Sequence, residues 1–298
     1  MRSMRRSGSV GILLAAGLAA APAGAATVFF STGSPDGKLA ALSRPSSPAG
    51  AETETADDFV LTGATRITSA SFTGLVTGTV APGAVQNVGV EIYRVFPQDS
   101  DVGRTDGPPS FGTSQVPTRV NSPSDVAFAD RDAAGLNMSF STTLIDPAFT
   151  ASNSVVSGIN PSPNFFTGGE GAVRGQETQF DVNFTTPLVL GAGHYFFVPV
   201  VQVSGGDFLW LSAPRPILSP GTPFPAGSTD LQAWIRNENL APDWLRIGTD
   251  ITHQGPFNMT FSLTGASVPE PGAWALMLTG FGLAGATLRR RNASRRMA

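Results

Sequence analysis

The sequence predicts an all-β body, an antiparallel β-sandwich of jelly-roll-like topology with about ten to twelve strands. Threonine, serine, valine and phenylalanine dominate the middle of the 298-residue chain, and these residue types favour strands over helices. The 34 glycines and 24 prolines supply the turns that such a fold needs. Strands do not alternate with helical segments and no repeat of fixed period occurs, which argues against a parallel α/β fold.

The predicted strands of the first half are short and separated by turn residues. They cover residues 28–30, 57–61, 66–76 and 85–96, with shorter candidates at 118–120 and 126–129 and an ambiguous one at 136–145. The strand at 85–96 stands out because Val88, Val90 and Ile92 recur on one face. Predicted loops, rich in proline, glycine, serine or aspartate, cover residues 31–55, 97–117 and 146–175.

The second half of the body alternates more regularly. Its predicted strands cover residues 179–185, 195–203, 208–211, 232–236, 244–247 and 257–264. The last of these places Phe257, Met259, Phe261 and Leu263 on one face and polar residues on the other. This pattern is typical of a half-buried antiparallel strand.

Charge and cysteine content exclude several functions. Residues 27–268 hold 11 basic and 21 acidic residues, a formal net charge of about −10. Such a surface repels nucleic acid, so no nucleic-acid partner is expected. The chain has no cysteine, which excludes disulfides, thiol catalysis and cysteine-based zinc sites.

The N-terminal segment has the three parts of a secretory signal peptide. Arg2, Arg5 and Arg6 form a basic region, and residues 10–21 form a short apolar run. Small residues at Ala23 and Ala25 fit cleavage after Ala25. Residues 1–25 are therefore predicted to be a signal peptide that exports the body.

The C-terminal segment also has three parts. Pro269-Glu270-Pro271 keeps the backbone extended, because each proline fixes φ and restricts the residue before it. The segment from Gly272 to Leu288 has no charge, and its 17 residues would span roughly 25 Å as a helix, the short limit for a bilayer. Three arginines, Arg289, Arg290 and Arg291, follow it, and a basic tail stays cytoplasmic. We therefore expect a transmembrane helix over Gly272 to Leu288.

This C-terminal order of box, apolar run and basic tail resembles the PEP-CTERM sorting signal. The box residues Pro269, Glu270 and Pro271, with Trp274 and Ala275, look like its PEPxxWA variety. The resemblance covers about 30 residues, and it implies recognition by an exosortase, a membrane-embedded cysteine protease that removes the tail. It further implies a Gram-negative host that exports polysaccharide, and a sorting substrate rather than an enzyme.

Together these features predict three regions: a signal peptide at 1–25, a β-sandwich ectodomain at 26–267 and a sorting signal at 268–298. The ectodomain is expected to be a non-catalytic protein of the cell envelope or extracellular matrix. We expect it to be anchored in the inner membrane with its body in the periplasm. After exosortase processing it would reach the cell surface or the medium.

Residues able to catalyse hydrolysis show no motif. His194 and His253 have no metal-ligand spacing and no Gly-x-Ser-x-Gly nucleophile elbow accompanies them. Paired carboxylates could hydrolyse glycosides, but nothing groups the candidate glutamates along the chain. These are Glu91, Glu170, Glu177 and Glu238. A sandwich hydrolase remains the alternative that a cleft with clustered acids would support.

The acidic residues that could bind a metal ion also follow no known metal-binding motif. Calcium prefers several oxygen ligands from a flexible loop. The predicted loops hold Asp-x-Asp pairs at Asp99 and Asp101 and at Asp130 and Asp132, but neither run continues as a calcium-loop motif. We read these aspartates as turn formers, and the sequence predicts no metal and no cofactor.

Three tryptophans carry the alternative function. Trp210, Trp234 and Trp244 lie within about 35 residues of one another. Aromatic faces can stack on sugar rings, and an arginine, Arg236 or Arg246, follows two residues after each of the last two tryptophans. The alternative is therefore a carbohydrate-binding module for exopolysaccharide; the competing interpretation is that the three indoles pack in the core.

Overall fold

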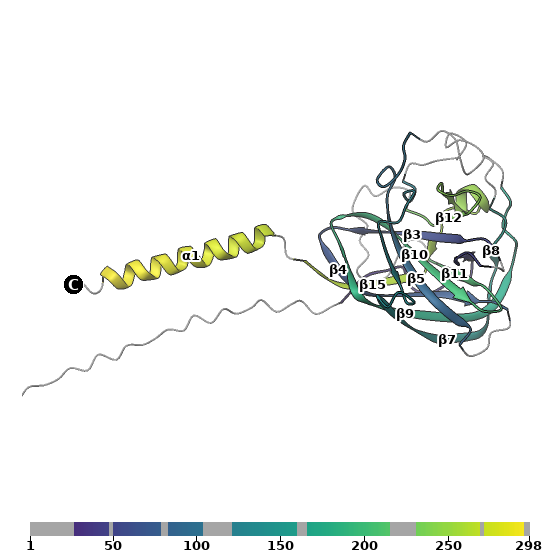
Figure 1. Ribbon diagram of the computed structural model, residues 1–298, viewed down its shortest axis with the longest axis horizontal. Coiled ribbons are helices and arrows are strands. Elements are labelled where there is room, and N and C mark those ends of the chain that lie inside the picture. The colour runs from purple at the N-terminus through teal and green to yellow at the C-terminus, as the bar shows by residue number, and fades with distance from the viewer. Residues whose placement is uncertain are drawn as a thin grey trace, which may run out of the picture.

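The computed structural model describes residues 27–47, 50–78, 83–103, 121–159, 166–214, 231–268 and 271–294. Within these ranges the chain forms two β-sheets, followed by a C-terminal α-helix (Figure 1). The all-β prediction is thus confirmed as a mostly-β fold with two antiparallel-rich sheets. The predicted signal peptide over residues 1–25 lies outside the described residues.

The larger sheet has nine strands, and β4 lies at its centre. One edge of β4 pairs with β15 and then β11, and the other edge pairs with β9. β1 flanks β15, β7 flanks β9, and β2 and β8 form a parallel pair beyond β11. The strands are β1 (Thr27–Ser31), β2 (Leu39–Leu42), β4 (Thr65–Val76), β7 (Met138–Ala151), β8 (Asn153–Val155), β9 (Val173–Leu190), β11 (Phe208–Ala213), β14 (Asn258–Met259) and β15 (Phe261–Ser267).

The smaller sheet has six strands in the order β13-β12-β3-β10-β5-β6. Its neighbouring strands pair antiparallel throughout. The strands are β3 (Thr53–Leu61), β5 (Val85–Arg94), β6 (Ala129–Asp132), β10 (Gly193–Val203), β12 (Trp234–Asn237) and β13 (Leu245–Arg246). A short π-helical turn, η2 (Ile247–Ile251), follows β13.

Aromatic side chains from both sheets meet between them and form the core. Phe72 of β4 stacks on Phe180 of β9 with ring centroids 5.0 Å apart, and Phe197 of β10 stacks on Phe261 of β15 at 5.1 Å. Phe72 and Phe197 come from opposite sheets, and their rings lie 6.1 Å apart. All four side chains are buried, and burial of one such ring stabilises the fold by about 1.5–3 kcal/mol. The two sheets therefore pack face to face.

Several strands lie where the sequence predicted loops. β3 begins at Thr53 rather than Asp57, and β2 and β8 fall inside predicted loops. Pairing between distant segments explains the difference: β2 is held between β11 and β8, and β7 pairs with most of β9. The predicted strand at 118–120 lies outside the described residues.

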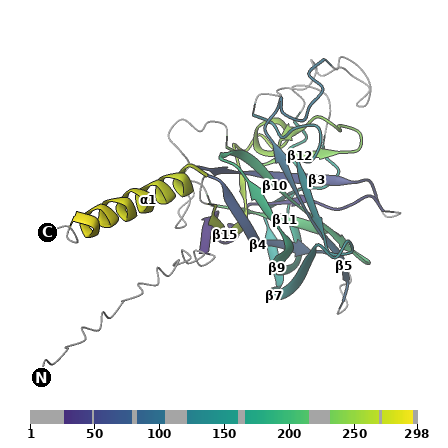
Figure 2. The ribbon, with the colours of Figure 1, turned by 60° about the vertical axis from the view of Figure 1, so that its left-hand side comes forward.

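The C-terminal helix α1 (Pro271–Ser294) contains the predicted helical segment and projects away from the sheets (Figure 2). It begins at a proline, which suits the first helical position because proline has no N–H and an N–H at that position would find no partner within the helix. Among the residues described, none of the helices is long and apolar enough to cross a membrane. The membrane-spanning role of Gly272 to Leu288 stays a prediction, and ten of these 17 residues are glycine, alanine or threonine.

Candidate functional site

The junction between the body and α1 is the first candidate site. β1 and β15 pair antiparallel, with Thr27 opposite Gly265, so the first strand starts where the last strand ends. The pairing of β15 continues to Ser267, and the Val268 N–H donates to the Ala64 carbonyl at 2.8 Å. Both ends of the body thus leave it at the same side, directly beside each other.

The sorting residues fall on either side of this junction. Pro269 and Glu270 lie outside the described residues, whereas Pro271, Trp274, Ala275 and the arginines 289–291 belong to α1. Large apolar side chains of α1 are exposed, with Leu278 and Phe281 each 72% exposed. Among the described residues, no contact with the body covers these two side chains, which fits a segment whose apolar surface meets another environment.

The three tryptophans are buried and offer no face to a ligand. Trp210 and Trp234 are fully covered and Trp244 is 1% exposed. Trp210 Nε1 donates to the Thr260 carbonyl at 2.7 Å, and Trp244 Nε1 donates to the Ser124 carbonyl at 3.1 Å. A sugar ring cannot stack on these indoles in this structure. The predicted glycan-binding role of these three residues is therefore corrected to core packing.

Arg236 stacks on an indole, but not on the one nearest in sequence. Its guanidinium carbon lies 4.3 Å from the ring centre of Trp244 and 5.2 Å from that of Tyr93. Arg246 instead pairs with Asp250, four residues further on, at 2.7 Å. The expected guanidinium–indole contact thus exists within the protein interior rather than on an exposed face.

Arg236 is the centre of a buried polar network that the sequence did not indicate. Its Nε donates to Glu54 and its Nη2 donates to the Tyr93 hydroxyl at 2.8 Å. Its Nη1 donates to the carbonyls of Asp125 and Pro242 at 2.9 and 3.2 Å. The network therefore ties β3, β5 and β12 to two loops. Glu54 escaped notice because it falls in the predicted loop at 31–55.

The Tyr93 hydroxyl lies between two carboxyl groups. It is 2.9 Å from Glu54 Oε1 and 2.7 Å from Glu91 Oε2. Burial and the neighbouring Glu54 carboxylate raise the pKa of Glu91 to about 7. Burial likewise raises the pKa of Tyr93. The two carboxyls are also in side-chain hydrogen-bond contact with each other, which is closer than the separation of roughly 5 Å or more between the two carboxyls of a glycosidase.

A cavity of about 290 Å³ opens beside this network. Its other acidic residues are Glu52, Asp125 and Glu238, and Glu238 accepts a hydrogen bond from the Glu52 N–H at 3.1 Å. In the described part of the chain, no three acidic or histidine side chains converge as metal ligands would. Glu54 and Glu91 are thus neighbouring acids that no third acidic or histidine side chain of the described residues joins as a metal ligand.

The remaining histidines and acidic residues that the sequence offered as catalytic or metal-binding candidates each contact different parts of the protein. His194 Nε2 lies 3.0 Å from Asp58 Oδ2, whereas the His253 ring lies against Phe166 at 4.4 Å. Glu170 accepts backbone N–H bonds from Val156 at 3.0 Å and Ser157 at 2.6 Å, as a loop-stabilising residue does. Two of the loop aspartates are also occupied: Asp99 pairs with Arg94, and Asp132 accepts from Asn87 at 2.7 Å.

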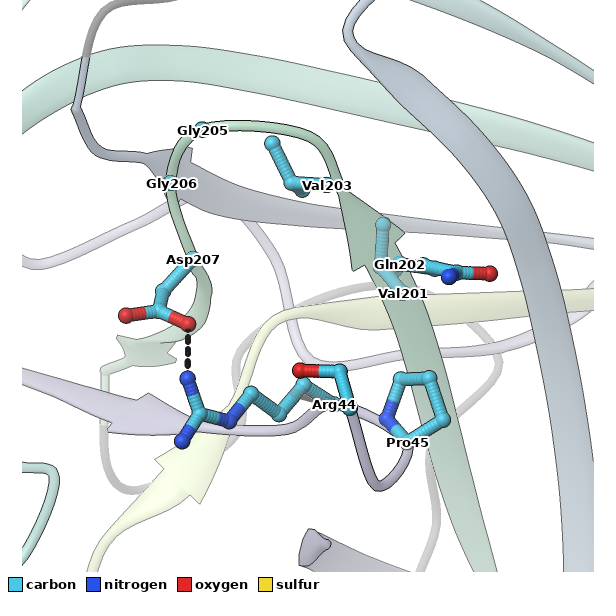
Figure 3. A pocket seen from close by; sticks show the side chains of 9 residues that line it. Arg44, Pro45, Val201, Gln202, Val203, Gly205, Gly206 and Asp207 are labelled. Atoms are coloured by element: carbon cyan, nitrogen blue, oxygen red, sulfur yellow. Dashed lines mark hydrogen bonds and ion pairs between the residues drawn. The ribbon is translucent and has the colours of Figure 1, made fainter. Parts of the chain in front are cut away.

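A further cavity of about 260 Å³ lies beside the turn after β10 (Figure 3). Figure 3 shows Arg44 and Asp207 pointing toward each other, and the two side chains form an ion pair. Arg44 Nε also donates to the Ala51 carbonyl at 3.3 Å. The two charged side chains of this cavity thus bind each other, and they hold the 205–207 turn against the segment before β3.

Comparison with known proteins bears on the junction alone. Residues 267–291 match the model of the PEP-CTERM protein-sorting motif. No curated protein and no solved structure gives a significant match to the chain. The matched residues begin at the last residue of β15 and extend through α1 as far as Arg291. The chain therefore carries a PEP-CTERM protein-sorting motif, which supports an exported protein that is sorted as an exosortase substrate.

Proposed function

We propose that the body is a non-catalytic component of the cell envelope or extracellular matrix, released from or re-attached at the membrane by an exosortase. The observation that carries the proposal is the sorting motif at residues 267–291, placed directly after the last strand of a folded body. Removal of α1 at this junction leaves every described strand in place. The sorting step therefore needs no unfolding of the core.

The position of the two chain ends supports an export route with the body outside the inner membrane. Thr27 and Gly265 are paired neighbours, so the predicted signal peptide and the sorting signal leave the body at one side. A body held at that side can face a membrane while both signals are processed. We place it in the periplasm before exosortase cleavage and at the cell surface or in the medium afterwards.

The interior of the body supports a non-catalytic role. The carboxyl pair of Glu54 and Glu91 is bridged by Tyr93, and His194 is held by Asp58 without a hydroxyl nucleophile bonded to its ring in the described part of the chain. General acid–base catalysis needs such groups within reach of a substrate. Here they serve neighbouring protein groups instead.

The test is to change Pro269, Glu270 and Pro271 to alanine in the full-length protein and express it in the host. We expect the variant to keep its C-terminal segment and to accumulate in the inner-membrane fraction. A matched control changes Ser139, Ser141 and Thr143, three exposed residues of β7, to alanine and is expected to mature normally. Normal maturation of the box variant would show that an exosortase does not read this box.

A further inference from the structure

A polar groove lies on the outer face of the larger sheet, away from the junction motif and the buried network. It encloses about 400 Å³, within the range of roughly 300–1,000 Å³ that ligand pockets occupy. Five neighbouring strands contribute to it: β1, β15, β4, β9 and β7. The residues that the argument uses are Ser71, Thr73, Ile145, Glu177, Gln179 and Ser262.

Strand register places hydroxyl and amide groups side by side across the floor of the groove. Ser71 is opposite Ser262, and their hydroxyl oxygens are 2.7 Å apart. Thr73 is opposite Gln179 on the next strand. Phe72 lies between Ser71 and Thr73 in sequence and points into the core, as alternation requires. The floor is therefore a row of neutral hydrogen-bonding groups.

Glu177 is the feature that points to a ligand. Its side chain lines the groove, yet the residue is only 7% exposed. Among the described residues its carboxylate has no hydrogen-bond donor, and its neighbour across the strands is the acidic Asp146. Burial, together with the Asp146 carboxylate, raises the pKa of Glu177. The carboxylate faces the groove, where hydroxyl donors of a bound ligand would supply the hydrogen bonds that it lacks among the described residues.

We propose that this groove binds a neutral saccharide segment, with the Glu177 carboxylate accepting hydrogen bonds from its hydroxyl groups. The side chains of Thr73 and Gln179 and the paired hydroxyls of Ser71 and Ser262 offer further donors and acceptors to a dense set of hydroxyls. Ile145 is 53% exposed and supplies an apolar wall for the C–H face of a sugar ring. This inference goes beyond the sorted-export function, and either can fail while the other stands.

The charge of the groove disfavours an anionic ligand. The acidic residues Glu177, Asp146 and Asp181 lie on two adjacent strands, and Asp181 accepts from the Gln179 amide at 2.9 Å. An anionic polymer would be repelled by this set of carboxylates. In the described part of the chain the acidic residues do not form a metal-binding group, so a cation-bridged saccharide is not expected either.

The test measures saccharide binding by the full-length protein in detergent micelles. Titration calorimetry would use neutral oligosaccharides prepared from the host's exported polysaccharide, together with gluco-, galacto- and manno-oligosaccharides. We expect one or more of these to bind, and Glu177→Gln to weaken binding at least tenfold. Glu238→Gln makes the same chemical change at an exposed residue of the cavity beside the Arg236 network. The Glu238→Gln protein is expected to bind the oligosaccharides as wild type does.

A second variant keeps the test decisive if Glu177→Gln folds poorly. Ile145→Ala shortens an exposed apolar wall and is expected to weaken binding about threefold while its thermal melting stays unchanged. Glucosamine and uronate oligomers serve as cationic and anionic probes. Binding confined to either charged oligomer, binding unaffected by both groove variants, or no binding of any neutral oligosaccharide would overturn the proposal.

Discussion

The Tyr93 hydroxyl and the Glu91 carboxyl lie 2.7 Å apart, although the same hydroxyl is also 2.9 Å from Glu54. A phenol carries one hydrogen and can donate to one of the two carboxyls only. It also accepts a hydrogen bond from Arg236. The second carboxyl must therefore bring its own proton, and the raised pKa of Glu91, about 7, identifies it as the group that keeps one.

This proton makes the stability of the body depend on pH. The folded state raises the pKa of Glu91 from 4.5 to about 7, so the folded state binds the proton more tightly than the unfolded chain. The stabilisation is complete below about pH 4.5 and is lost as the pH rises through about 7. Glu91→Gln imitates the protonated group and should be more stable than wild type at pH 8 by about 3 kcal/mol.

Urea unfolding at pH 5 and pH 8 measures this difference. Wild type and Glu91→Gln should be similar at pH 5 and should separate at pH 8. Glu238→Gln, at an exposed site, should follow the pH dependence of wild type. Parallel pH profiles of wild type and Glu91→Gln would contradict the proton assignment.

Arg236 should be far more important for stability than an exposed arginine. Arg236→Met removes the partner of Glu54, which is 5% exposed, and leaves that carboxylate buried without its cation. Loss of one partner of a buried pair costs about 3–5 kcal/mol. The control Arg94→Met breaks the more exposed pair with Asp99 and should cost under about 1 kcal/mol. Equal losses in chemical denaturation would show that the network does not hold the fold.

Gly74 is required where β4 passes β11. A Cβ at this position would lie 2.7 Å from the Leu209 carbonyl and would also overlap the Phe208 ring. Gly74→Ala should therefore lower the free energy of unfolding by about 1–3 kcal/mol. Gly191→Ala is the matched control, because a Cβ there meets no atom within 4 Å. A melting temperature unchanged by Gly74→Ala would mean that β4 and β11 are packed less closely.

The fold class could be predicted from local pattern, whereas the strand set could not. Alternation at 257–264 marks residues of β14 and β15, and the face shared by Val88, Val90 and Ile92 marks β5, because a half-buried strand repeats every two residues. β2 has no such alternation: all four residues from Leu39 to Leu42 are buried. Its identity depends on partners about 110 to 170 residues away, which no local window contains.

The candidate sites, too, could be predicted where their residues are contiguous in sequence and not where folding brings them together. The sorting motif is contiguous, so the sequence was sufficient to identify it. Glu54 and Glu91 are brought together only when β3 and β5 each pair with β10. The three tryptophans were ambiguous because a large amphipathic ring suits a core as well as a sugar platform. Glu177 could not be told from a surface residue by its local sequence, because its burial depends on β4 and β7, which pair on either side of β9.

Intact-mass spectrometry of the mature protein tests the central claim most directly, because it reports both processing events in one measurement. Protein recovered from the cell surface or the medium should begin close to residue 26 and should lack the segment from Gly272 to residue 298. Protein extracted from a strain without exosortase should retain that segment. A mature protein whose mass still includes α1, with the same mass in both strains, would contradict sorting at this junction.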